Sequence, residues 1–136
     1  MTVEIIGLAI LALITLVLVT SVLLRIAPKP VRKSKFNSKW KQLQKYCAHK
    51  ETWPRALIDA DNLLDQAMKN KKIKGSNMGE RLVDAQKIFS NNEAIWVAHK
   101  LCNKVQENQK LRLKETEVKK ALISIGQGLK DLGVLK

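Results

Sequence analysis

A chain of 136 residues with a formal net charge of +13 and two cysteines has room for one small domain beside a membrane segment. It is too short for two hydrophobic cores, and two cysteines in a cytoplasmic domain do not suggest a disulfide. The basic excess is concentrated, with +9 over residues 25–50, so the charge points to an anionic partner beside that segment.

The first predicted element is a transmembrane helix. Residues 5–24 contain no charged side chain, and a helix of that length spans about 30 Å, the thickness of the hydrocarbon core of a bilayer. A buried core helix is disfavoured because so short a chain cannot surround a helix that is apolar on every face. The segment is too long for a cleaved signal and has no base before it, so residues 1–24 are predicted to be a retained anchor.

Residues 25–35 are predicted to be a basic linker, in which Pro28 and Pro30 stop the helix. Nine bases and no acid occur between residues 25 and 50. The positive-inside rule therefore places the C-terminal domain in the cytoplasm and the N-terminus outside the cell membrane. Anionic lipid headgroups explain the basic run better than nucleic acid does. The residues expected to contact them are Arg25, Lys29, Arg32, Lys33 and Lys35.

Residues 36–136 are predicted to form an all-α cytoplasmic bundle of about five helices. The sequence has no apolar run of period two and no Asn-Gly or Asp-Gly hairpin turn. Helices are expected over about residues 37–49, 53–68, 79–89, 93–106 and 116–132. The stretch 69–79 is expected to be a loop because it is rich in Gly, Asn and Ser. Three tryptophans are expected to anchor the core, and they are Trp40, Trp53 and Trp96.

Two further expectations concern polar and small residues within these helices. Asp59, Asp61 and Asp65 are expected to face away from the apolar side of their helix as solvated charges. Gly126 and Gly128 are expected to weaken the last helix or to let a neighbouring element approach closely.

Metal binding is not expected. Cys47, His49, His99 and Cys102 could together supply two sulfur and two nitrogen ligands to zinc. The Cys-x-His half has poor spacing, however, and a free cysteine is commonly a small core residue. We therefore predict no metal and no other cofactor, and we expect His99 to be a packed, hydrogen-bonded histidine. The stretch 71–76 lacks the Gly-Lys-Ser/Thr of a nucleotide-binding loop and is expected to be solvated.

The fourth predicted helix of the bundle carries a family resemblance. Residues 98–107, AHKLCNKVQE, resemble the motif helix of HEPN domains, which are small all-helical bundles and in many cases dimeric ribonucleases. The family motif is an Arg, often followed by Asn, then four to six residues and a His. Cys102 stands at the Arg position, Asn103 matches the next one, and the positions open to the His hold Glu107, Asn108 and Gln109. The resemblance covers about residues 37–132 and implies a bundle that lacks both chemically active residues.

The whole chain is also similar to bacterial single-pass membrane proteins, a resemblance that implies no known activity. Together these observations favour a membrane-anchored, non-catalytic interaction module that binds a protein partner or a second copy of itself. The alternative is a membrane-tethered HEPN-type ribonuclease, or an RNA-binding domain that uses residues 69–74 and the basic flank. A ribonuclease needs a positioned acid–base group and a cation, for which His99, Lys100 and Lys104 remain. The expected interaction face is Trp96, His99, Cys102, Asn103 and Gln106.

Overall fold

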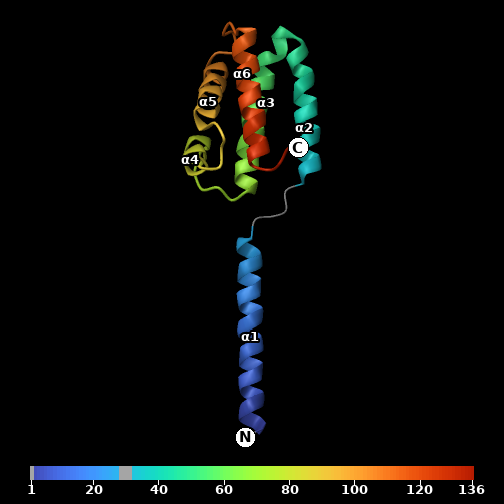
Figure 1. Cartoon of the computed structure of the whole chain (residues 1–136), viewed down its shortest axis with the longest axis vertical. Helices are drawn as coiled ribbons and strands as arrows, with labels where there is room; N and C mark the ends of the chain where they lie inside the picture. The colour runs from blue at the N-terminus through green and yellow to red at the C-terminus, as the bar shows by residue number, and fades with distance from the viewer. Residues whose placement is uncertain (1, 28–31) are drawn as a thin grey trace.

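The computed structural model describes residues 2–27 and 32–136, and every regular element in these residues is helical. The prediction of an all-α chain with one apolar N-terminal helix and a helical bundle is confirmed (Figure 1). The elements are α1 (Thr2–Ile26), α2 (Lys33–Lys45), the short 3-10 helices η1 (Tyr46–Ala48) and η2 (Lys50–Thr52), α3 (Trp53–Asn70), α4 (Met78–Asp84), α5 (Asn92–Glu107) and α6 (Glu115–Asp131).

Helix α1 stands apart from the bundle and buries none of its residues (Figure 1). Among the described residues it is the one helix that is long and apolar enough to cross a membrane. The hydroxyls of Thr15, Thr20 and Ser21 donate to backbone carbonyls three or four residues earlier, which satisfies them inside the helix. The helix continues to Ile26, past the predicted end at residue 24. Pro28 and Pro30, which are predicted to end this helix, lie outside the described residues.

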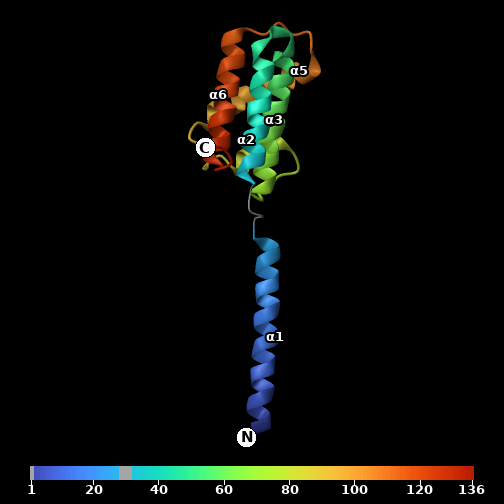
Figure 2. The same ribbon diagram turned by 90° about the vertical axis from the view of Figure 1, so that its right-hand side faces the viewer.

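The bundle is built around α3, which packs against α2, α5 and α6, while α5 also packs against α6 (Figure 2). Consecutive long helices alternate in direction, so the start of α2, the end of α3 and the end of α6 lie at the same end of the bundle (Figures 1 and 2). The side chains of Lys39 and Gln66, with Nζ and Oε1 3.0 Å apart, mark the antiparallel register of α2 and α3.

The hydrophobic core contains residues from every α-helix from α2 to α6, and all of its buried residues fall between Phe36 and Leu135. Helix α1 contributes none of them, so the bundle has a core of its own, and we expect it to fold without α1. The largest side chains that are fully buried are Leu57, Leu64, Met68, Leu82, Ile95, Ile125 and Leu129.

Helix α2 differs from the prediction at both ends. It begins at Lys33, inside the predicted linker, and this earlier start lets Phe36 reach the core. It ends at Lys45 instead of residue 49, because side chains take the carbonyls that a continuing helix would use. The hydroxyl of Thr52 donates to the carbonyl of Tyr46, and the Trp53 indole N–H donates to the carbonyl of Cys47.

Helix α4 is shorter than predicted, since it ends at Asp84 and not near residue 89. The chain then tightens into turns in which the N–H of Ile88 donates to the carbonyl of Ala85 at 2.8 Å. These turns bring Phe89 into the core, where its side chain is 7% exposed. The helix boundary is therefore set by the position that the core offers to Phe89.

The tryptophans and the last helix show how the core is closed. Trp40, Trp53 and Trp96 are partly buried and pack against the margin of the core instead of its centre. A Cβ added at Gly126 would lie 2.9 Å from Cζ2 of Trp40, and one added at Gly128 would lie 2.9 Å from Cδ1 of Ile95. The predicted close approach to these two glycines is confirmed.

Candidate functional site

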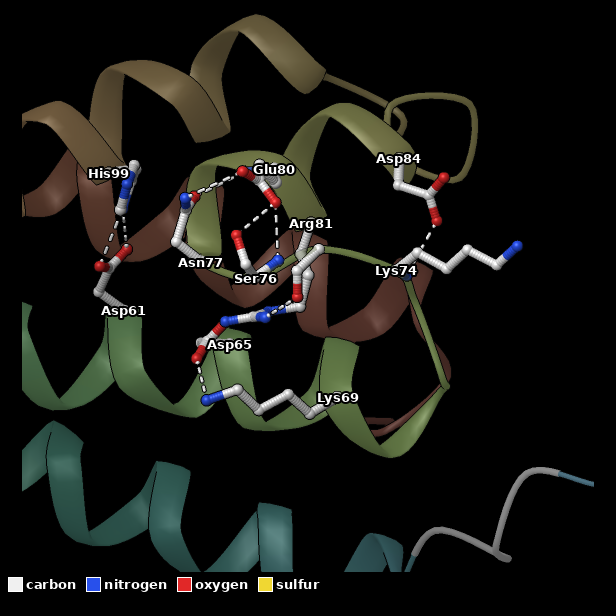
Figure 3. A network of polar contacts seen from close by, with 11 residues as sticks. Asp61, Asp65, Lys69, Lys74, Ser76, Asn77, Glu80, Arg81, Asp84 and His99 are labelled. Carbon is white, nitrogen blue, oxygen red and sulfur yellow. Dashed lines mark hydrogen bonds and ion pairs between the residues drawn. The ribbon is translucent and has the colours of Figure 1, made fainter. Parts of the chain in front are cut away.

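The charged side chains that the bundle buries gather between α3, α4 and α5 (Figure 3). Asp61 and Arg81 are 3% and 6% exposed, and each has a partner on another helix, His99 for Asp61 and Asp65 for Arg81. These four residues are called the buried polar cluster below. They hold the three helices together from inside.

Asp61 of α3 and His99 of α5 form a hydrogen-bonded pair. The Nδ1 atom of His99 lies 3.1 and 3.0 Å from the two carboxylate oxygens of Asp61. The side chain of His99 is 12% exposed and that of Asp61 is 4% exposed. Burial raises the pKa of Asp61 by more than the hydrogen bond from His99 lowers it. His99 is thus the packed, hydrogen-bonded histidine that the sequence predicts.

The second ring nitrogen of His99 also has a partner. The side-chain amide of Asn103 lies 3.3 Å from Nε2. The ring of Trp96 meets the imidazole edge-on, with centroids 6.0 Å apart and an angle of 70° between the planes. Trp96, His99 and Asn103 therefore stand together on α5, as predicted for the interaction face, but His99 is engaged within the bundle.

Of the other two residues of the predicted face, Cys102 does not reach the surface. Cys102 is buried, its thiol donates to the carbonyl of Leu57 at 3.3 Å, and burial raises its pKa. Its inclusion in a surface is wrong, because position 102 continues the core stripe of Ala98 and Val105. Gln106 is exposed near the end of α5.

Arg81 connects α4 to α3 and to the loop between them. Its Nε donates to Oδ1 of Asp65 at 2.7 Å, and its Nη1 donates to the carbonyl of Gly75 at 2.6 Å. Lys69 approaches the other oxygen of Asp65 at 2.7 Å. Burial raises the pKa of Asp65, but the hydrogen bonds from Arg81 and Lys69 outweigh burial and hold that pKa below its ordinary value.

The expectation that all three aspartates of α3 face solvent is correct only for Asp59, whose side chain is 44% exposed. It is wrong for Asp61 and Asp65 because His99 and Arg81 approach them from α5 and α4. Sequence analysis also does not single out Arg81. One feature of the sequence could have pointed to such a partner. Asp61 and Asp65 stand four residues apart on one side of α3, and two carboxylates that become buried there need partners from other helices.

The loop before α4 is fixed by its own side chains. Asn77 caps α4, and its Oδ1 accepts from the N–H of Glu80 at 2.9 Å. The carboxylate of Glu80 accepts from the N–H and the hydroxyl of Ser76, both at 2.7 Å (Figure 3). The N–H groups of Ser76 and Glu80 are thus bound by side chains of this same segment.

The residues considered for zinc do not converge. Cys47 lies in η1 with its thiol 3.8 Å from the carbonyl of Leu43, while Cys102 is buried against α3 and His99 is bound to Asp61. Across residues 2–27 and 32–136, no three His, Cys, Asp or Glu side chains are placed to hold a metal ion.

An apolar groove of about 680 Å³ runs between α5 and α6. Val97 and Ile123 line it and are 63% and 69% exposed, although both are aliphatic. The groove residues that the argument uses are Val97, Leu101, Ile123, Lys100, Lys104 and Lys120, and they are called the α5–α6 groove below. Ile123 also borders a second hollow of about 460 Å³ between α2 and α6.

Sequence analysis does not predict this groove. Val97 and Ile123 lie off the apolar stripe that each helix turns to the core, so they are easily taken for isolated surface residues. They form one surface only because α5 and α6 pack side by side.

The residues predicted to contact lipid headgroups belong to two elements. Arg25 lies in the last turn of α1, Arg32 precedes α2, and Lys33 and Lys35 are exposed at the start of α2. Lys29 lies outside the described residues.

No protein-family model, curated protein or solved structure matches this chain. The similarity to HEPN domains therefore stays a prediction from residues 98–107. A proposal about function has to be argued from the residues of this chain.

Proposed function

We propose that this protein is a membrane-anchored interaction module. Helix α1 spans the cell membrane, and the cytoplasmic bundle binds an acidic amphipathic helix of a protein partner without carrying out chemistry. The observation that carries the proposal is the α5–α6 groove, in which Val97 and Ile123 are exposed beside lysine side chains. The long apolar α1 supports the membrane part of the proposal.

A helix is the occupant that fits the shape of this groove. Two antiparallel helices that pack side by side leave a furrow along their axes, into which the apolar ridge of a third helix can dock. The apolar anchors of the furrow are Val97, Leu101 and Ile123. Its volume of about 680 Å³ is enough to take up several apolar side chains of a partner. Full burial of an exposed Val or Ile contributes roughly 1.5–3 kcal/mol.

The charges around the groove favour an acidic partner. Lys100, Lys104 and Lys120 lie along it, with Glu93 and Glu117 also on its lining. The whole chain carries a formal net charge of +13. A second copy would bring the same positive charge to the contact, whereas an acidic segment would be steered toward it.

The ribonuclease alternative has less support from these residues. The family's Arg is replaced by Cys102, a buried thiol, which carries no positive charge in either protonation state. Both ring nitrogens of His99 have partners within the bundle. A group that moves protons for a substrate must be able to reach it. Binding without chemistry is therefore the function that we propose.

The test uses a fragment of residues 32–136 and two synthetic amphipathic helical peptides. The peptides share one leucine face and differ in carrying either glutamates or lysines along its flanks. We expect the glutamate peptide to bind at least tenfold more tightly at low salt and to shift the nuclear magnetic resonance signals of α5 and α6. Val97→Asp and Ile123→Asp should each reduce this binding by at least tenfold, because they place a charge in the apolar furrow.

Val83→Asp is the matched control, since Val83 is 55% exposed on α4 and lies outside the groove. It should bind the peptide as the parent does. Signals that shift away from α5 and α6, or an equal effect of all three variants, would remove the groove from the proposal. A fragment that dimerises through the groove as its concentration rises would replace the acidic partner by a second copy.

A further inference from the structure

The turn that follows α3 carries a group of lysines on a fixed backbone. The N–H of Ile73 donates to the carbonyl of Met68 at 3.1 Å, and the N–H of Lys72 donates to the carbonyl of Lys69 at 3.0 Å. Lys72 has a φ of 60°, and Ile73 packs against the core. This is the geometry of a Schellman helix end. Lys74 extends the fixed part, because its N–H donates to the carboxylate of Asp84 at 3.0 Å.

The choice of residue at position 72 is informative. A left-handed φ at the end of a helix is usually taken by glycine, because a Cβ adds a steric cost there. This turn has a lysine instead and directs a charged side chain to the surface at that cost. The presence of lysine and not glycine at position 72 therefore needs an explanation other than the folding of the turn.

The nearby carboxylates are engaged with other groups. Asp65 is bound by Arg81 and Lys69, and Glu80 accepts from Ser76. Lys71, Lys72 and Lys74 are all exposed, and no acid in the described parts of the chain forms an ion pair with them. The turn therefore exposes three lysine side chains that form no ion pair with the described residues, while the carboxylate of Asp84 accepts from the backbone N–H of Lys74.

The same end of the bundle holds the start of α2. Because α2 and α3 are antiparallel and Lys39 meets Gln66, the first turn of α2 and the end of α3, from which this turn leads, lie at the same end of the bundle (Figures 1 and 2). That turn of α2 exposes Lys33 and Lys35. Lys33, Lys35, Lys71, Lys72 and Lys74 are called the basal lysine cluster, which joins two segments far apart in the sequence.

The covalent chain keeps this cluster close to the end of α1. Only five peptide steps separate Ala27 from Arg32, and a fully extended chain covers at most roughly 3.6 Å per residue. Arg32, directly before α2, can therefore lie no more than about 18 Å from Ala27, directly after the membrane helix, whatever path the connection takes. A tether of this length lets the cluster reach the anionic headgroups, whose attraction falls off within a Debye length of roughly 8–10 Å at physiological salt.

We propose that the basal lysine cluster docks the folded bundle onto the anionic lipid surface, as a second membrane contact beside the anchor. RNA is the weaker candidate, because single-stranded RNA sites combine bases with aromatic stacking platforms and the cluster has no aromatic member. The docked bundle has its base on the membrane, and residues 108–114, at the opposite end, are directed away from it (Figure 1). This contact goes beyond the proposed function and does not depend on a partner in the groove.

The test measures binding of the fragment of residues 32–136 to vesicles, which removes the anchor and leaves the bundle with its own core. Vesicles of phosphatidylcholine alone are compared with vesicles that also contain phosphatidylserine. We expect binding only with phosphatidylserine, and we expect it to weaken as salt is raised. Each lysine near an anionic surface contributes about fivefold to the partition constant. The triple variant Lys71→Gln, Lys72→Gln, Lys74→Gln should therefore bind about a hundredfold more weakly.

A matched triple variant at the opposite end is the control. Lys110→Gln, Arg112→Gln and Lys114→Gln remove the same charge from exposed positions and should leave binding within about threefold of the parent. Circular dichroism is to be used to check that each variant is folded. An equal loss in both triple variants would overturn the proposal, because net charge alone would explain it. Tighter binding to an oligouridine than to the phosphatidylserine vesicles at the same salt would also overturn it. Peptide binding in the α5–α6 groove is measured separately, so either proposal can fail alone.

Discussion

At the scale of single residues, Arg81 decides where α4 sits. Its side chain is 7% exposed and binds Asp65 together with the carbonyl of Gly75. Arg81→Leu would leave Asp65 partly buried with Lys69 as its remaining charged partner. Removal of one member of a buried ion pair typically costs about 3–5 kcal/mol. We therefore expect Arg81→Leu to lower the free energy of unfolding by about 3 kcal/mol at pH 7, measured by urea denaturation.

The pH dependence of this effect has a definite sign. The folded state holds the pKa of Asp65 below its ordinary value, so the stabilisation is present above about pH 4 and is lost as the pH falls through the lowered pKa. The difference between parent and variant should shrink in that acid range. Lys119→Leu is the control, because it breaks an ion pair with Glu115 in which the two side chains are 73% and 69% exposed. It should change the free energy of unfolding by less than about 0.5 kcal/mol. Equal losses in both variants would show that the Arg81 pair does not matter.

The residue scale is also where sequence analysis reaches least far. Helical spacing shows on which side of α3 a residue stands, but it does not show which residue another helix will bring there. His99 was predictable as a hydrogen-bonded group, whereas its partner Asp61 was not. The approach of Arg81 depends on the loop that Asn77 and Glu80 hold in place, and no periodic pattern records that path.

At the scale of elements, the packing of α2 on α6 depends on a missing side chain. Gly126→Ala would place a Cβ 2.9 Å from the rigid ring of Trp40. Overpacking costs about 1–3 kcal/mol, and replacing glycine by alanine inside a helix gains up to about 1 kcal/mol. We expect a net loss of about 1 kcal/mol. In a Trp40→Ala background the clash is gone, so the same substitution should instead stabilise the bundle by about 1 kcal/mol.

A double-mutant cycle by thermal or urea unfolding tests this reversal. The four proteins are the parent, the two single variants and the double variant, and the coupling between positions 40 and 126 should be about 2 kcal/mol. The same sign for Gly126→Ala in both backgrounds would mean that Trp40 is not the reason for the glycine.

Elements whose ends are set locally were predicted well. Helices α5 and α6 fall close to their predicted bounds because a long apolar stripe and a capping residue define them, as when Asn91 accepts from the N–H of Ala94 at 3.0 Å. Helices α2 and α4 end where side chains from beyond the helix stop them. The side chains of Thr52 and Trp53 close the first, and the burial of Phe89 closes the second. Those contacts exist only in the folded bundle.

At the scale of the whole molecule, three features point in one direction. The apolar α1 buries no residue in the bundle, the basal lysine cluster lies at the end of the bundle where α2 begins, and the α5–α6 groove lies along the side. The first of these could be predicted from residues 5–24 alone. The other two join segments that only the fold brings together. Sequence analysis names Lys33, Lys35 and the stretch 69–74 separately, but their common place at one end of the bundle is seen only in the structure.

The orientation of α1 completes this arrangement. Nine bases follow the apolar segment before residue 51, and a single acid precedes it, so the bundle should be cytoplasmic. Protease added to inverted membrane vesicles should digest the bundle, and in sealed spheroplasts the bundle should resist until detergent is added. As a control, a variant with the bases Arg25, Lys29, Arg32, Lys33 and Lys35 changed to Gln and three lysines inserted before Ile5 should give the opposite pattern, because the charge bias is reversed. Digestion of the parent's bundle in intact spheroplasts would show that it lies outside, where neither an acidic cytoplasmic partner nor the cytoplasmic lipid surface could reach it.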